Sequence, residues 1–207
     1  MNHIWSFNCD KNPCPAGLFS SKSDLAVWIK AHQLTGYLAL YPVDISVYDW
    51  ALKHHNFKIN KEEYKSPKFI QTFSSASQVH YHYEAGICRP GHDEEVVQHQ
   101  SFNPGQLWVF LGIDSDFPAA VFSERDKAES WINRYKLNGN VILYPVDITL
   151  YDRAIQNNYI SGDNPEVSTK EFISNYTPDR LKQLVYQEGI LKGHIQHDGK
   201  RQNYFTV

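Results

Sequence analysis

The stretch Tyr41-Pro42-Val43-Asp44-Ile45, followed by Tyr48-Asp49, occurs a second time as Tyr144-Pro145-Val146-Asp147-Ile148, followed by Tyr151-Asp152. The two copies lie 103 positions apart. At this offset residues 4–87 align with residues 107–190 without a gap, and about 25 of the 84 aligned positions are identical. A match that holds over the length of a fixed period indicates an internal duplication.

Each copy has the size of a small domain. We therefore predict two homologous domains at residues 1–87 and 107–190, joined by a linker at 88–106 and followed by a C-terminal extension at 191–207. The linker contains the proline and glycine residues that are typical of a loop. The extension ends in Tyr204-Phe205-Thr206-Val207, which suits an edge strand or a segment that packs across the domain boundary.

The pattern of apolar residues predicts the same elements in each copy. Short aromatic strands are expected at 4–7 and 16–19, and another at 37–41. A helix with a capping-box-like start at Ser21 or Ser123 follows the second strand, and Gly36 and Gly139 are its expected C-caps. A second helix is expected at 45–55 and 148–158, then a helical segment near 69–73 and a closing strand. The fold class is α+β, as two ββαβα(α)β domains with an antiparallel or mixed sheet.

The repeated motif itself predicts a strand end and a helix start. Asp44 and Asp147 stand where an N-cap is expected, since a carboxylate there accepts hydrogen bonds from the free N–H groups of the first turn. Val43 and Tyr48 would then form a hydrophobic staple. Asp49 and Asp152 are not explained by this cap. They are candidates for contacts with a partner, although a structural or solvated role is the simpler interpretation.

Composition describes an ordinary globular chain. Of the 207 residues, 42% are apolar and 14% aromatic, which is sufficient for a core, and the net charge of −3 does not favour nucleic-acid binding. The sequence shows neither a secretory signal nor a run of the ~20 apolar residues that cross a bilayer. The three cysteines Cys9, Cys14 and Cys88 suggest reduced thiols. We therefore expect a soluble, cytoplasmic protein that does not bind a membrane.

No motif predicts a catalytic, cofactor or metal site. His80 and His82 share one face of a predicted strand, a spacing that can hold a metal, but their counterparts are Gln183 and Val185. Cys9 and Cys14 lack a second pair of ligands at similar spacing. No nucleophile elbow, phosphate-binding loop or dinucleotide-binding glycine motif is present.

Function is expected where the two copies differ. Trp50 aligns with Arg153, and residues 107–190 carry 12 acidic and 8 basic residues, against 7 and 8 in residues 4–87. The second copy could present an acidic face to a basic partner. The candidate partner-binding residues are Asp49, Trp50, His80, His82, Asp93, Glu94, Glu95, Asp152 and Arg153.

The series Trp-x-Phe, Phe-Ser, Trp-Ile, Leu-x-Gly, Tyr-Pro-Val-Asp and Tyr-Asp, present in both copies, resembles a bacterial family of small domains of unknown function. The resemblance covers about four fifths of the chain. Members of that family are usually single domains, so the tandem copy departs from the pattern. The resemblance implies no catalytic residues.

We expect a non-enzymatic protein-binding module. Its sharpest form is a cytoplasmic immunity protein that neutralises a bacterial toxin by occluding its active site. One alternative is an enzyme with a site in the first copy only, drawn from Cys9, Cys14, His80 and His82. Another is a self-associating scaffold whose C-terminal tail exchanges between chains.

Overall fold

A computed structural model describes residues 1–10, 12–89, 102–197 and 202–206. The first repeat contains β1 (His3–Cys9), β2 (Pro15–Phe19), α1 (Lys22–Ala31), β3 (Gly36–Pro42), β4 (Ile45–Ser46), α2 (Val47–Lys53), the 3-10 helix η1 (Glu62–Lys65), α3 (Pro67–Gln71), β5 (His80–Glu84) and β6 (Ile87–Cys88). The second contains β7 (Gln106–Gly112), β8 (Ala120–Phe122), α4 (Arg125–Tyr135), β9 (Gly139–Pro145), β10 (Ile148–Thr149), α5 (Leu150–Gln156), α6 (Lys170–Ser174) and β11 (Gln183–Gln187). The hairpin β12 (Ile190–His197) and β13 (Gln202–Thr206) follows.

The strands form two antiparallel sheets, which confirms the predicted α+β class and the duplication. The first sheet has the order β10-β2-β1-β3-β5-β6, and the second β13-β12-β11-β9-β7-β8-β4. The C-terminal extension therefore adds edge strands to the second sheet, one of the two arrangements expected for it. The two domains are repeats of one plan, in which the long strands alternate between two buried faces.

Each sheet is completed by a short strand from the other repeat. Strand β4 pairs with β8, so that Ile45 lies opposite Val121, and β10 pairs with β2, so that Ile148 lies opposite Leu18. Both short strands belong to the repeated motif. The motif thus carries the chain from one sheet to the other, and it does so in both directions.

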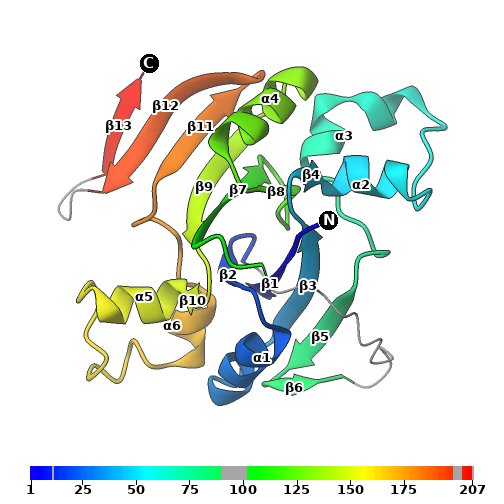
Figure 1. The fold of residues 1–207 in the computed structure, drawn as a ribbon. Coiled ribbons are helices and arrows are strands. Elements are labelled where there is room, and N and C mark those ends of the chain that lie inside the picture. Colours follow the sequence, from blue (N-terminus) through cyan, green and yellow to red (C-terminus); the bar gives the residue numbers. More distant parts are fainter. Residues whose placement is uncertain (11, 90–101, 198–201, 207) are drawn as a thin grey trace.

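The helices after the motif follow the same exchange. Tyr48 of α2 and Ile70 of α3 are buried in one cluster with Phe110 of the second repeat. Conversely, Tyr151 of α5 and Ile173 of α6 join the cluster around Phe7. Figure 1 shows α2 and α3 beside α4, and α5 and α6 in the half of the molecule that contains β2 and α1. The helices that cover each sheet therefore come from both repeats.

A third cluster holds the two sheets together. Ile4, Leu18, Val109 and Tyr144 are among its fully buried members, and Tyr41 is 3% exposed. These residues come from the strands of both repeats, so the sheets pack face to face across a shared apolar layer. Removing this layer from water is the main contribution that holds the repeats together.

The predicted caps of the second helix are wrong. Ser46 and Thr149 are the N-caps: the Ser46 hydroxyl accepts from the Asp49 N–H at 3.0 Å, and Thr149 does the same for Asp152. Asp44 instead has a left-handed backbone, with φ of 68°. The two-residue strand lies between Asp44 and the helix. The helix consequently starts two residues later than expected, and Val43 and Tyr48 do not occupy staple positions.

The two glycines predicted as C-caps begin strands instead. The first helix of each repeat ends earlier, and Lys136 adopts the left-handed conformation at the end of α4. Gly139 opens β9, where a Cβ atom would clash with the carbonyl oxygen of Leu111 on the neighbouring strand. Glycine is required here because two backbones approach closely, not because a helix must end.

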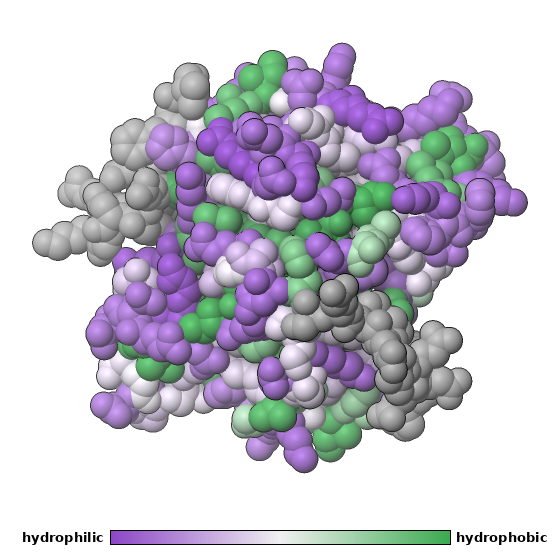
Figure 2. All heavy atoms as spheres, viewed as in Figure 1, coloured by the Kyte–Doolittle hydropathy of each residue, from purple (hydrophilic) through white to green (hydrophobic). Residues whose placement is uncertain are grey.

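The surface is mixed. On the face drawn in Figure 2, hydrophobic residues form small areas separated by hydrophilic ones. Within the described ranges, no helix combines the length and the apolar character that crossing a bilayer requires.

Candidate functional site: paired grooves at the exchanged motif

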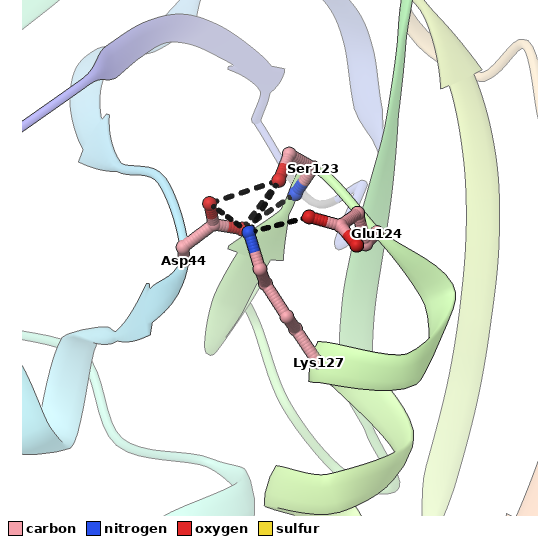
Figure 3. Close-up of polar contacts among 4 residues, drawn as sticks. All are labelled: Asp44, Ser123, Glu124 and Lys127. Carbon is pink, nitrogen blue, oxygen red and sulfur yellow. Dashed lines mark hydrogen bonds and ion pairs between the residues drawn. The ribbon is translucent and has the colours of Figure 1, made fainter.

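Asp44 and Asp147 fasten the exchanged segments to the other repeat. The Asp44 carboxylate accepts from the backbone N–H and the hydroxyl of Ser123, each at 2.8 Å, and forms an ion pair with Lys127 at 2.9 Å (Figure 3). Asp147 accepts in the same way from Ser20, at 2.7 Å from the backbone N–H. A left-handed aspartate thus anchors the start of each exchanged strand.

Asp44 and Asp147 differ in their charged neighbours. Partial burial alone would raise the pKa of Asp44, but hydrogen bonds from Lys127 and Ser123 lower it below the ordinary value. Lys127 also bonds Glu124 at 2.7 Å, and its own pKa is raised by these two carboxylates. In the first repeat the residue aligned with Lys127 is Asp24. The anchor at Asp147 therefore has an acidic residue at the position where the anchor at Asp44 has a lysine.

Asp49 forms a second contact between the repeats. Its carboxylate accepts from the Ser46 hydroxyl at 2.7 Å, the Trp131 indole at 3.0 Å and the Tyr135 hydroxyl at 2.7 Å. Burial, reinforced by this carboxylate, raises the pKa of Tyr135. Asp152 accepts from Thr149 at 2.8 Å, but the residues aligned with Trp131 and Tyr135 are Trp28 and His32. The Trp28 indole nitrogen is buried and has no hydrogen-bond partner in the described part of the chain.

These contacts border two equivalent grooves. The balanced groove, of about 670 Å³, contains the acids Asp44, Asp49 and Asp126 and the bases Lys53, Lys127 and Arg134. The acidic groove, of about 570 Å³, contains Asp24, Asp147 and Asp152, and the described residues that line it include neither Lys nor Arg. The three bases are replaced by Asp24, Ala31 and Gln156 in the alignment. Trp28 and Ile155 supply an apolar wall beside the carboxylates.

The structure brings only some of the predicted partner residues together. Asp152 lines the acidic groove and Asp49 the balanced one. Trp50 is half-buried and packs on His54, with ring centroids 5.1 Å apart. Arg153 lines a small pocket on α5 beside Tyr159.

The remaining predicted residues lie elsewhere. His80 and His82 line a pocket between the sheets, with ring centroids 5.3 Å apart. Asp93, Glu94 and Glu95 lie outside the described residues. Asp24 and Trp28 were missed by the sequence reasoning. The replacement of Lys127 by Asp24 in the alignment was the signal that could have identified this groove.

The structure places Cys9 away from the two histidines of the enzyme alternative, and Cys14 is not among the described residues that line their pocket. Cys9 is buried with Phe7 on one face of the first sheet, where Tyr81 also points, so His80 and His82 lie on the opposite face. Burial raises the pKa of Cys9 to about 12 and that of Cys14 to about 11, which keeps both thiols protonated at neutral pH. Among the described residues, no three His, Cys, Asp or Glu side chains are grouped to hold a metal ion.

Comparisons with known proteins identify the repeated unit. The family model described as "Domain of unknown function (DUF7710)" matches residues 4–89 and again residues 107–192. The two matches cover most of the chain and correspond to the two repeats. No curated protein and no solved structure matches.

Proposed function

This chain belongs to the family of Domain of unknown function (DUF7710), and we propose that it is a non-catalytic protein-binding member of that family. The observation that carries the proposal is the acidic groove, in which Asp24, Asp147 and Asp152 lie beside Trp28 and Ile155. No basic residue of the described ranges lines it. Carboxylates beside an apolar wall suit a Lys or Arg side chain, because its stem packs on the wall while its charge meets the acids.

The partner is therefore a protein with a basic surface. The more specific form of the proposal is an immunity protein that acts in the cytoplasm and neutralises a bacterial toxin by occluding its active site. A nuclease toxin would carry such a basic surface, since its substrate is a polyanion. The net charge of −4 on residues 107–190 would assist the encounter, because complementary charge accelerates association.

Affinity purification of the tagged full chain from its native host tests this proposal. The wild type is compared with Asp24→Lys, which places in the acidic groove the residue found at the same position of the second repeat. Glu166→Lys, an equal charge change on an exposed loop, is the matched control. We expect a basic protein to bind the wild type and the control, to dissociate as salt is raised, and to be lost with Asp24→Lys.

Two results would contradict the proposal at different levels. Recovery of the same partner with Asp24→Lys, at equal salt dependence, would refute the acidic groove as the binding site. A captured partner whose toxic activity is unchanged by a stoichiometric amount of this protein would refute the immunity function while leaving protein binding in place.

A further inference from the structure

A pocket of about 220 Å³ lies on the face of the first sheet that meets the second sheet. Ala39 forms its floor, opposite Ser6 on β1 and His80 on β5. The aligned residue of the second repeat is Ile142, which is buried in the central cluster. The small side chain of Ala39 thus leaves open a space that the second repeat fills.

Aromatic rings form the walls of this pocket. Tyr37 packs edge-on against His82, with ring centroids 4.7 Å apart, and against Phe117 of the second repeat, at 5.5 Å. The pocket is therefore completed by both repeats. Ser74 and Ala76 are exposed at its edge, which provides a route for entry. The volume is below the ≈ 300–1,000 Å³ of sites for drug-sized molecules, so it suits about one ring.

Tyr41 also lines the pocket. Tyr41 is 3% exposed, and no group in the described part of the chain hydrogen-bonds to its hydroxyl. Burial raises the pKa of this phenol, so it keeps its proton at neutral pH and can donate. The hydroxyl is not among the fully buried polar atoms without a partner, so solvent reaches it, and the hydroxyl of a ligand would replace that solvent.

His80 also lines the pocket, but its ring is already engaged. Its Nδ1 atom lies 2.8 Å from the carbonyl oxygen of Gln78, and its ring centroid lies 5.3 Å from that of His82. Among the described residues that line the pocket, Lys, Arg, Asp and Glu are absent. These residues offer no counter-charge to a charged ligand, which favours an uncharged one.

We propose that this pocket binds a single uncharged aromatic ring that bears a hydroxyl group, the chemistry of a phenol. The ring lies over Ala39 and contacts Tyr37 and Phe117, while its hydroxyl hydrogen-bonds with Tyr41. This site is separate from the acidic groove and is independent of the proposed function. The ligand is either a free phenol or the side chain of a tyrosine in another chain.

Titration of the full-length protein with 4-methylphenol, followed by calorimetry and NMR, tests the proposal. We expect saturable binding to the wild type, and weaker binding of toluene, which has the ring without the hydroxyl. Tyr41→Phe should weaken 4-methylphenol binding about three- to tenfold, the value of one hydrogen bond. Tyr159→Phe, a partly exposed tyrosine outside the pocket, should leave it unchanged.

Ala39→Ile provides a test of the space itself. This variant copies the residue of the second repeat, so the sheet accommodates the side chain in the same register, and thermal unfolding verifies its fold. We expect 4-methylphenol binding to be abolished. Binding of the two compounds with equal affinity, or undiminished binding by Ala39→Ile, would overturn the proposal, as would no binding by the wild type.

A further titration distinguishes a free phenol from a tyrosine side chain of another protein. N-acetyl-tyrosine amide carries the flanking peptide groups of a tyrosine side chain. If it binds as tightly as 4-methylphenol, a tyrosine of another chain fits the pocket. If only 4-methylphenol binds, the ligand is a free phenol. Asp24→Lys should not affect either titration, so failure of this proposal and failure of the acidic groove are separable.

Discussion

The four motif aspartates are chemically identical, and their neighbours give them different roles. Asp44 and Asp147 anchor the crossing between the sheets, whereas Asp49 and Asp152 accept a hydrogen bond from the hydroxyl that caps the following helix. Only Asp49 also accepts hydrogen bonds from the other repeat, from the Trp131 indole and the Tyr135 hydroxyl. The difference lies in which residues of the other repeat face each carboxylate.

Replacement of Asp49 should therefore be more destabilising than the same change at Asp152. Asp49→Ala leaves the Trp131 N–H and the Tyr135 hydroxyl without their acceptor, whereas Asp152→Ala removes only the capping contact. We expect a difference of about 1–3 kcal/mol in the free energy of unfolding, measured by urea denaturation. Equal losses would show that the Asp49 contacts contribute little.

Asp44 should contribute a pH-dependent part of the stability. Because its pKa is lowered in the folded protein, its contribution is present above the unfolded pKa of about 3.9 and is lost as pH falls through the folded value. Asp44→Asn should be less stable than the wild type at pH 6, and this difference should shrink below about pH 4. Lys127→Met should reduce the same difference at pH 6. A gap that is constant with pH would contradict this assignment.

At the scale of the elements, the N-cap of each exchanged helix is a serine or a threonine. Ser46 and Thr149 are fully buried and cap α2 and α5, although the preceding aspartates look like the stronger caps in the sequence. The aspartates are unavailable because a two-residue strand separates them from the helices. Pairing of that strand with the other repeat therefore determines where the helix begins.

Removal of a cap hydroxyl tests this boundary. Thr149→Ala should lower the free energy of unfolding by about 1 kcal/mol, since the Asp152 N–H loses its acceptor. Thr149→Ser keeps the hydroxyl and should recover most of the loss, and chemical denaturation measures both. A serine variant as unstable as the alanine variant would instead assign the effect to the lost methyl group.

At the scale of the whole molecule, two repeats share three apolar clusters. Each of the two outer clusters includes helices from both repeats, and the central cluster includes strands from both. Neither repeat can lose its structure without exposing apolar surface of the other. We therefore expect the repeats to unfold as one unit, although each is recognised as a separate domain in the sequence.

Heat should accordingly unfold the described fold in one transition. Calorimetry of the full chain is expected to give a calorimetric enthalpy equal to the van't Hoff enthalpy. Probes placed in each repeat should report the same midpoint, within the error of the measurement. Two resolved transitions, each assigned to one repeat, would show that the exchanged segments contribute too little to couple the repeats.

Local sequence determined the duplication, the alternation of the long strands, the order of the elements and the α+β class. These properties depend on short-range periodicity, which each repeat carries in full. The same reasoning placed His80, His82 and Asp152 among the candidate partner-binding residues, which stays a prediction. It did not identify Asp24, Ala39 or Tyr41, because their surroundings are made by residues distant in the chain.

Two segments, one after Pro42 and one after Pro145, could each join either sheet. Only the tertiary structure decided which sheet each of them joins. The two repeats are homologous, so this segment finds similar partners on its own sheet and on the other one. A periodic pattern is the same in both arrangements and cannot distinguish them. The choice follows from the left-handed turn at Asp44 and Asp147 and from the side chains that receive it, and it creates the acidic groove.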